Sequence, residues 1–334
     1  MKRQVEFDLL KGLGILFVIL GHSVPDFPVN LRADMLSSTL EQIMYAFHMP
    51  LFFVCAGYMA QMVDNISNGG GYLTFVKKKF LRLLIPYFSF SFLSLGLKLL
   101  FSSFTRSSVD FFSGVYGIFC EGKFFWFLYV MFEVLIMIEF LKRLKLKIVF
   151  FWLIAIVFYL LGLYLNTNFL CLNMFGYYLI FALIGMACYK SKSYIDMLLQ
   201  RWHIVLLLFV IFISLFLLRE RQSIIMKEIC RFILAICGTG LTYSVCLLIK
   251  KTQYRFKSEL SYFGKISLPV YLVHMINQLP IYYLVAKMNL PLPVISVAII
   301  FIITTIITYF MVEIMLRVPF LNYMIGMSPR KNKQ

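Results

Sequence analysis

The sequence predicts an all-α integral membrane protein, a single polytopic bundle of about ten transmembrane helices, and three observations support this fold class. First, 61% of the 334 residues are hydrophobic and only 14% are charged, which is far more apolar than a soluble domain. Second, apolar stretches of about 16–22 residues recur along the whole chain, close to the ~20 residues that a helix needs to cross a bilayer. Third, only short polar or basic segments separate these stretches, which leaves little room for a soluble domain.

The first apolar stretch is expected to be a retained helix rather than a signal peptide. It contains Gly12, Gly14 and His22, and it lacks a clear small-x-small cleavage site. No repeat or long linker interrupts the stretches that follow. We therefore expect one domain over residues 1–334, with a short basic tail at 316–334 and spans at 9–24, 41–63, 84–104, 124–141, 148–165, 174–189, 204–218, 229–249, 268–286 and 294–315.

The basic residues predict the orientation of these spans. A net charge of +17 would suggest nucleic acid as the partner of a soluble protein, but here the Lys and Arg side chains lie between apolar stretches, so no nucleic acid is expected. Placing both the N-terminus and the C-terminus in the cytoplasm puts 23 of the 32 basic residues on the inner side, as the positive-inside rule requires. The seven cysteines show no spacing typical of a metal site, and no metal is expected.

Two segments expected on the outer side carry polar side chains. Residues 25–40 contain two prolines and several charged residues. The second segment is more strongly charged, and within residues 219–231 it holds Arg219, Glu220, Arg221, Lys227, Glu228 and Arg231. This segment is either a solvated loop or a rim that recognises a polar or anionic acceptor, and the sequence leaves both interpretations open.

Ionisable side chains inside the spans, or at their edges, are the first candidates for function. Each costs about 2.5–3.5 kcal/mol at a helix centre on insertion scales, so such residues usually have a role. In this chain they are Asp8, Lys11, His22, His48, Glu133, His274 and Glu313. The remaining histidine, His203, falls at the edge of a span and is the weakest candidate.

Lys11 and His22 are expected to lie on one face of the first helix. Eleven residues make close to three turns, so the two side chains point the same way, about 16 Å apart along the axis. Asp8 lies near that face and is expected to pair with Lys11 three residues later. Alternatively, Lys11 is an interfacial residue that reaches the membrane surface and His22 is hydrogen-bonded at the helix end. Spacing alone leaves both interpretations open.

Several motifs resemble those of the membrane acyltransferase-3 family, especially its fucose 4-O-acetylase branch. FDLLKG at 7–12, followed by His22, is similar to the family's pairing of a basic residue with a histidine in the first span. Further similar motifs follow in the family's order: FHMPLFF at 47–53 with GY at 57–58, RLLIPY at 82–87, WFL at 126–128 and SLPVYLVH at 267–274. The resemblance therefore covers most of the chain.

Two positions depart from the family pattern. Lys11 stands where Arg is commoner, which keeps the charge but loses the bidentate fork that grips phosphate. Ala56 stands where Ser is usual, so position 56 offers no nucleophile in this protein. We expect activity to be retained, because Lys11 keeps the positive charge.

The resemblance implies an O-acyltransferase of a bacterial plasma membrane. The implied donor is cytosolic acetyl-coenzyme A or another acyl-coenzyme A, the acceptor is a hydroxyl of a cell-surface glycan or its lipid-linked precursor, and membrane lipids surround the protein. An imidazole titrates near neutral pH, so His22 suits the general base. The implied site comprises His22, Asp8 and His48 for catalysis, Lys11, Arg82 and Tyr58 for the donor, and Trp126, Glu133, Tyr271 and His274 for the acceptor.

The residues proposed to bind the donor and the acceptor also have purely structural interpretations, and the sequence leaves both open. Trp126 and Glu133 share a helix face, which suits a wall that stacks a sugar but also suits an interfacial belt with a paired carboxylate. Arg82 is either a phosphate contact or a topology anchor. Tyr271 and His274, three residues apart, either join the site or form a structural polar pair.

Two other functions compete with acyl transfer. A transporter of a glycan, a lipid or protons would also place His, Glu and Lys inside the membrane, but the sequence shows no inverted repeat and no paired broken spans. An inactive relative that serves as a scaffold is the other alternative, and Ala56 gives it slight support.

Overall fold

The structure is a computed structural model that describes residues 4–64, 70–104, 109–165, 167–219, 223–253 and 255–327. Every regular element in these ranges is helical. The structure thus confirms the all-α membrane fold class. Two residues of the charged outer segment, Glu220 and Arg221, lie outside the described ranges, as do residues 328–334 of the basic tail.

The chain divides into two compact units. The first unit comprises Met1–Cys55 and Lys190–Phe310, and the second comprises Ala56–Tyr189 and Met311–Gln334. Two of the three boundaries fall inside the long helices α2 (Met35–Asp64) and α14 (Pro293–Met315), and the third falls at the end of α8 (Leu172–Lys190). Each unit is described below by itself, and the expectation of one domain stays a prediction.

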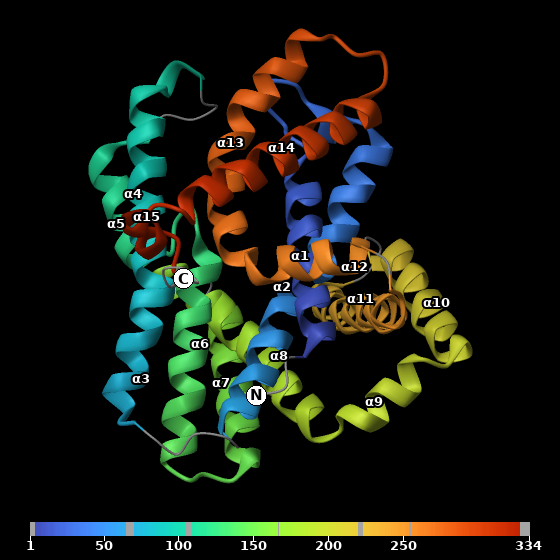
Figure 1. Ribbon diagram of the computed structural model, residues 1–334. Coiled ribbons are helices and arrows are strands. Elements are labelled where there is room, and N and C mark those ends of the chain that lie inside the picture. Colours follow the sequence, from blue (N-terminus) through green and yellow to red (C-terminus); the bar gives the residue numbers. More distant parts are fainter. Residues whose placement is uncertain are drawn as a thin grey trace. The chain divides into compact units, whose positions relative to one another are not determined.

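The first unit contains the helices that carry the first and the last of the family-like motifs. These are the helix with Lys11 and His22 and the helix with His274 (Figure 1). Helix α1 packs against α11, α12 and α13. The helices that lie wholly or mainly in this unit are α1 (Val5–His22), α2 (Met35–Asp64), α9 (Lys192–Leu199), α10 (Trp202–Leu218), α11 (Ile224–Lys251), α12 (Arg255–Lys265), α13 (Ser267–Lys287) and α14 (Pro293–Met315). A short 3₁₀ turn, η1 (Leu31–Ala33), precedes α2.

The second unit contains the remaining helices. Its helices are α3 (Tyr72–Lys79), α4 (Ile85–Leu100), α5 (Phe111–Cys120), α6 (Trp126–Arg143), α7 (Ile148–Leu165), α8 (Leu172–Lys190) and α15 (Pro319–Met324). A π-helical segment, η2 (Phe80–Leu84), joins α3 to α4, and two 3₁₀ turns, η3 (Ser102–Phe104) and η4 (Phe169–Cys171), precede α5 and α8. Helix α3 packs against α6, and α15 packs against α4.

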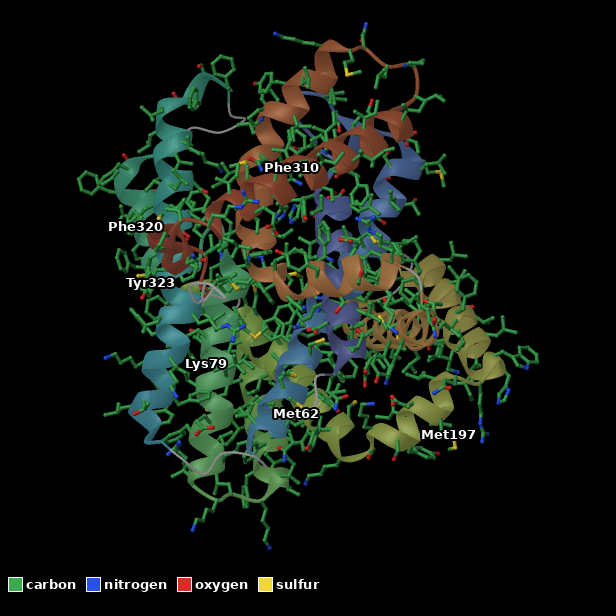
Figure 2. The ribbon with its side chains drawn as sticks, in the orientation of Figure 1. Met62, Lys79, Met197, Phe310, Phe320 and Tyr323 are labelled. Carbon is green, nitrogen blue, oxygen red and sulfur yellow. The ribbon has the colours of Figure 1, made fainter. Side chains whose placement is uncertain are left out.

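Six helices in the described ranges are long and apolar enough to cross a membrane, or seven if the pair α9 and α10, bent by 82°, is one span. Every expected span coincides with a helix, but α1, α6 and α13 carry too many polar residues to qualify by composition alone. The count of ten spans therefore stays a prediction. Large apolar side chains are exposed on these helices, including Phe310 of α14, and also on the short helix α15, at Phe320 and Tyr323 (Figure 2). This exposure is expected for a protein that lipid surrounds.

Segments expected to be loops contain helices, and this is the main correction to the predicted fold. Helices α5, α9, α12 and α15 lie between or after the expected spans, and the helix expected from 84 begins at Tyr72. These helices have 6 to 11 residues, and α12 buries Leu260 while Arg255 is 93% exposed. A hydropathy window tuned to about 20 apolar residues misses short amphipathic helices of this kind.

Two glycines allow α12 to lie directly against α1, as Figure 1 shows for the crossing of these helices. A Cβ atom at Gly264 would meet the carbonyl oxygen of Asp8, and one at Gly12 would meet the carbonyl oxygen of Leu260. Because both obstacles are backbone atoms, neither can rotate away. The contact therefore requires glycine, and it holds the half of α1 that carries Asp8 and Lys11.

Glu6 joins three helices of the first unit near the start of α1. Its side chain is 2% exposed, and its two carboxylate oxygens lie 2.8 Å from Nζ of Lys192 and 3.1 Å from Nζ of Lys250. Lys192 also bonds Asp196, which accepts a hydrogen bond from the Tyr243 hydroxyl. Burial alone would raise the pKa of the Glu6 carboxyl, but the hydrogen bonds from the two lysines, with one from the backbone, hold its pKa below the usual value.

We expect Gly264→Ala to destabilise the protein by about 1–3 kcal/mol, because the new methyl group overlaps the Asp8 carbonyl and α12 must shift. Thermal unfolding in detergent measures the effect. The matched control is Gly96→Ala on α4, where no atom lies within 4 Å of an added Cβ, so helix propensity should make it neutral or slightly stabilising. Equal melting temperatures for the two variants would contradict the close contact.

We expect Glu6→Gln to destabilise the protein by about 1–3 kcal/mol at pH 7, because two ammonium groups lose a buried anionic partner. The folded-state pKa of Glu6 is lowered, so its stabilisation is complete above the unfolded-state value of about 4.3 and is lost as the pH falls below it. Melting curves of both proteins should therefore converge on acidification. Glu259→Gln, which removes an exposed pair with Arg255, should change little at any pH; a constant gap for Glu6→Gln would refute the assignment.

Candidate active site

His22 is the last residue of α1, and neighbouring contacts fix its backbone. The Tyr282 hydroxyl on α13 donates to the His22 carbonyl oxygen at 2.5 Å. The next residue, Ser23, is buried and donates its hydroxyl to the Ile19 carbonyl one turn earlier. The imidazole therefore projects from a helix end whose position two helices determine.

Three histidine side chains of the first unit lie together, and each comes from a different helix. The rings of His22 on α1 and His274 on α13 have centroids 5.5 Å apart. The Tyr45 ring on α2 is 5.6 Å from the His22 ring and 5.2 Å from the His48 ring. His48 and His274 are 4% and 0% exposed. Predicted candidates from three distant motifs thus converge in space.

The hydrogen bonds of His48 and His274 define their tautomers. Nδ1 of His48 lies 2.6 Å from the Met44 carbonyl, and Nδ1 of His274 lies 3.1 Å from the Val270 carbonyl, each one turn earlier on the same helix. A carbonyl oxygen only accepts, so Nδ1 carries the proton in both rings and Nε2 has a lone pair. His48 therefore has no N–H at Nε2 to offer an oxyanion.

Two buried nitrogen atoms at this site lack a partner within the described ranges. Nε2 of His274 and the side-chain amide nitrogen of Gln278, one turn later on α13, form no hydrogen bond there. Gln278 is 3% exposed. A buried polar atom without a partner costs about 1–3 kcal/mol, so such atoms usually mark a place that a ligand or water completes. The histidines are not arranged as a metal site: none of the described groups of His, Cys, Asp and Glu could hold a metal ion.

Sequence reasoning missed Tyr45 and the ion pair next to it. The Tyr45 hydroxyl lies 3.1 Å from Nδ1 of His22. Arg32 bonds both carboxylate oxygens of Glu41 at 2.9 and 2.5 Å, and Glu41 is 6% exposed. Glu41, Tyr45 and His48 share one face of a helix by their spacing, which was an available signal. Burial alone would lower the pKa of the Arg32 guanidinium, but Glu41 raises it, so Arg32 stays charged.

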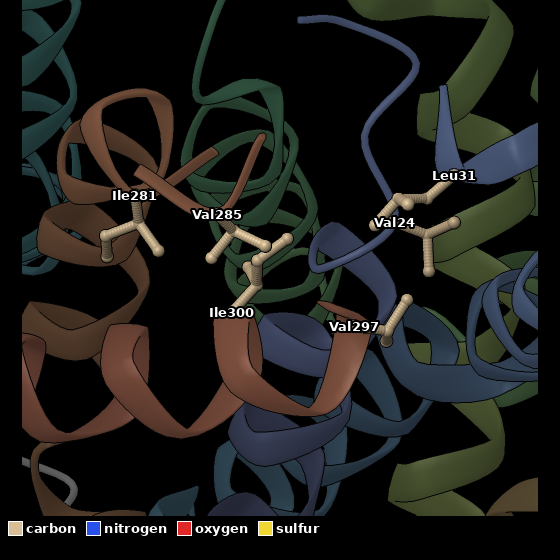
Figure 3. Close-up of a cluster of buried hydrophobic side chains, with 6 residues drawn as sticks. All are labelled: Val24, Leu31, Ile281, Val285, Val297 and Ile300. Atoms are coloured by element: carbon tan, nitrogen blue, oxygen red, sulfur yellow. The ribbon is translucent and has the colours of Figure 1, made fainter. Parts of the chain in front are cut away.

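The loop that carries Arg32 is anchored by a buried cluster of apolar side chains. Leu31, next to Arg32, packs with Val24 and with residues of α13 and α14 in the cluster shown in Figure 3, which comprises Val24, Leu31, Ile281, Val285, Val297 and Ile300. Asp34 then caps α2 by accepting hydrogen bonds from the Ser37 backbone and hydroxyl, and these bonds lower the pKa of its carboxyl. The loop thus holds a fixed conformation beside His22.

Asp8 and Lys11 form the expected pair on α1. Nζ of Lys11 lies 3.1 Å from a carboxylate oxygen of Asp8, and the two side chains are 27% and 14% exposed. Tyr271 lies near His274 as its spacing predicted, with ring centroids 5.7 Å apart. The contacts are therefore as expected, whereas the roles of these four residues stay predictions.

Tyr58 and Arg82 belong to the second unit. Tyr58 is buried, and its ring contacts that of Tyr189 with centroids 5.2 Å apart. Arg82 is exposed in the π-helical segment η2. Short π-helical turns often occur at functional sites, but the donor-binding roles of both residues stay predictions.

Trp126 and Glu133 also belong to the second unit, on α6. The Trp126 ring stacks on that of Tyr178, with centroids 5.3 Å apart and an angle of 29° between the planes. One carboxylate oxygen of Glu133 is buried and has no hydrogen-bond partner among the residues that the structure describes. Their acceptor-binding role stays a prediction.

The charged outer segment lines a shallow cavity of about 220 Å³ in the first unit. Its polar lining consists of Arg219, Lys227, Glu228 and Arg231. Arg219 also hydrogen-bonds Gln42 on α2 and lies over the Phe216 ring. Part of the expected loop is helical, because α11 begins at Ile224.

Comparison with known proteins identifies the family of this chain. The acyltransferase-3 family model, described as an acyltransferase domain, matches residues 4–313. This match runs from α1 to within two residues of the end of α14, and it includes His22, His48 and His274. No curated protein and no solved structure gives a significant match. Because the family model spans nearly the whole chain, this multi-pass membrane protein belongs to the acyltransferase-3 family.

Proposed function

We propose that this protein transfers an acyl group, most simply acetyl, from cytosolic acyl-coenzyme A to a hydroxyl of a cell-surface glycan or its lipid-linked precursor, with His22 as the general base. The convergence of His22, His48 and His274 from three helices carries the proposal. The proposed setting is a bacterial plasma membrane with both termini inside. The fucose 4-O-acetylase branch, suggested by the motifs, belongs to the same proposal.

The proposed reaction is a direct transfer. The acceptor hydroxyl gives its proton to Nε2 of His22 while its oxygen attacks the thioester carbonyl, forming a tetrahedral oxyanion. The C–S bond then breaks, and the imidazolium returns the proton to the departing thiolate of coenzyme A. The products are the acylated hydroxyl and the free thiol. No covalent enzyme intermediate is needed, and Ala56 provides no nucleophile for one.

The buried polar atoms on α13 suit the substrates of this reaction. The amide nitrogen of Gln278 is a donor without a partner in the described chain, which is what a developing oxyanion requires in a site that excludes water. Nε2 of His274 is an acceptor, which suits a hydroxyl of a sugar. We assign the oxyanion to Gln278 and an acceptor hydroxyl to His274.

Lys11 is proposed to attract the phosphates of the donor from the cytoplasmic side. Asp8 holds its ammonium group at 3.1 Å, and the Lys11 side chain is still 27% exposed. The donor's pantetheine arm is long and extended, so it can carry the thioester from Lys11 along α1 toward His22. A lysine contacts phosphate as a point charge rather than through a bidentate fork, so this role concerns affinity more than geometry.

We expect His22→Ala to lower the rate of thiol release from acetyl-coenzyme A by about 10²–10⁴-fold, because the general base is lost. The purified protein in detergent is assayed with a membrane glycolipid extract as the acceptor source. His203→Ala is the matched control, since His203 is exposed on α10 and should change nothing. If the wild type binds no acyl-coenzyme A and releases no thiol with any extract, the enzymatic function is wrong and transport is tested next.

We expect Lys11→Ala to raise KM for acetyl-coenzyme A about tenfold to a hundredfold with kcat little changed, because a charged contact made equally in the ground and transition states is lost. Lys11→Arg should keep a low KM. Lys287→Ala, at the exposed end of α13, controls for a general loss of positive charge. A fall in kcat at unchanged KM would place Lys11 in the chemical step instead.

A further inference from the structure

His22 differs from the other two histidines in the partner of its Nδ1 atom. Nδ1 of His48 and of His274 each bonds a carbonyl of its own helix, which fixes the proton on that atom. Nδ1 of His22 instead lies 3.1 Å from the Tyr45 hydroxyl. Because a hydroxyl both donates and accepts, this contact alone leaves the His22 tautomer undecided. The tautomer depends on whether another group accepts the hydrogen of the Tyr45 hydroxyl.

Two charged residues act on the Tyr45 hydroxyl. Glu41 lies one turn earlier on α2, and both Glu41 and Arg32 interact electrostatically with Tyr45. Arg32 grips Glu41 through two hydrogen bonds and also lies 3.7 Å from Asp26. The buried Glu41 carboxylate, paired with Arg32, accepts hydrogen bonds.

The position of this ion pair is set by packing on both sides. Leu31, adjacent to Arg32, is 3% exposed in the apolar cluster of Figure 3. The Tyr45 ring lies where a Cβ atom on Gly21 would meet it, so the ring rests directly against α1. We name the set of Arg32, Glu41 and Tyr45 the tyrosine clamp.

We infer that Tyr45 is a positioning residue for His22, acting through the tyrosine clamp. The Tyr45 O–H donates to the Glu41 carboxylate, and its oxygen accepts the N–H at Nδ1 of His22. Nε2 of His22 is then left with its lone pair toward the acceptor hydroxyl. The carboxylate of Glu41 also offsets the positive charge of Arg32, which otherwise opposes the imidazolium formed during transfer. The importance of this tautomer for catalysis rests on the proposed function; the tautomer itself does not.

In many enzymes a carboxylate hydrogen-bonds a catalytic imidazole and fixes its orientation. Here the Tyr45 phenol lies between the Glu41 carboxylate and the His22 imidazole. A partner of this kind fixes the tautomer and the ring orientation without touching substrate. We expect Tyr45→Phe to lower kcat for thiol release about tenfold to a hundredfold while KM for acetyl-coenzyme A is unchanged. Glu41→Gln, which keeps the size of the side chain, should lower kcat in the same direction.

The test reads the tautomer directly by ¹⁵N-histidine magnetic resonance on the full-length protein in detergent. The chain has only four histidines, so His22 is assigned from the signals lost in His22→Gln. The wild type should carry its proton on Nδ1 of His22, and Tyr45→Phe and Glu41→Gln should shift the ring toward a mixture or the other tautomer. Wild-type His22 protonated at Nε2, or a tautomer unchanged in Tyr45→Phe, would overturn the inference.

Two further variants separate positioning from a loss of structure. Tyr282→Phe removes a hydroxyl that bonds the His22 carbonyl rather than its ring, so it should lower the melting temperature without changing the tautomer. Tyr309→Phe changes a residue whose ring stacks on Phe263. It should change neither the melting temperature nor the His22 tautomer. If the wild type releases no thiol, the proposed function fails while the tautomer measurement still decides the inference; if thiol release is intact in Tyr45→Phe, only the positioning role fails.

Discussion

A polar side chain inside a bilayer has no water to bond, and this constraint organises the first unit. Three of its buried or half-buried carboxylates face cations: Glu6 contacts Lys192 and Lys250, Asp8 contacts Lys11, and Glu41 contacts Arg32. Against this background, one nitrogen atom each of His274 and Gln278 lacks a partner within the described ranges, as do the hydroxyls of Thr239 and Thr304. The two nitrogen atoms lie on the helix whose histidine contacts His22, where substrate is proposed to bind.

Helix packing turns scattered polar residues into a site. Helix α1 is held by glycine contacts with α12 near Asp8 and by the Tyr282 hydroxyl at His22, so both ends of its functional face are fixed. Helix α2 then brings Tyr45 and His48 to the same place, and α13 brings His274. Because three separate helices meet there, the spacing of the histidines along the chain carries no information about their distances in space.

The sequence predicted what is local, and it missed what is distant. Long apolar stretches identified the helices at the expected spans, and three-residue spacing identified the Asp8–Lys11 pair, because both follow from the geometry of one helix. Short amphipathic helices such as α12 were missed, since they lack a long apolar stretch. The contact of Tyr45 with His22 joins two helices, so no pattern within either helix predicts it.

The motif resemblance located functional positions but could not say how they cooperate. It pointed to His22, His48 and His274 in three separate motifs, and the family match confirmed the family. Their convergence came only from the structure, as did the tautomers that distinguish them. Tyr58, Arg82, Trp126 and Glu133 belong to the second unit, so their part in the site is still known only from the motifs.

The segment between α1 and α2 shows why loop residues deserve the same scrutiny as intramembrane ones. The sequence marked residues 25–40 only as a polar outer segment. In the structure Leu31 is buried, Asp34 caps α2, and Arg32 bonds both oxygens of Glu41. The buried neighbour Leu31 fixes the backbone of Arg32, and Glu41 fixes its side chain. Arg32 therefore contributes a positive charge of fixed position near the His22 ring. A change in this loop therefore acts on the electrostatics of the proposed base, although none of its residues lies in a family motif.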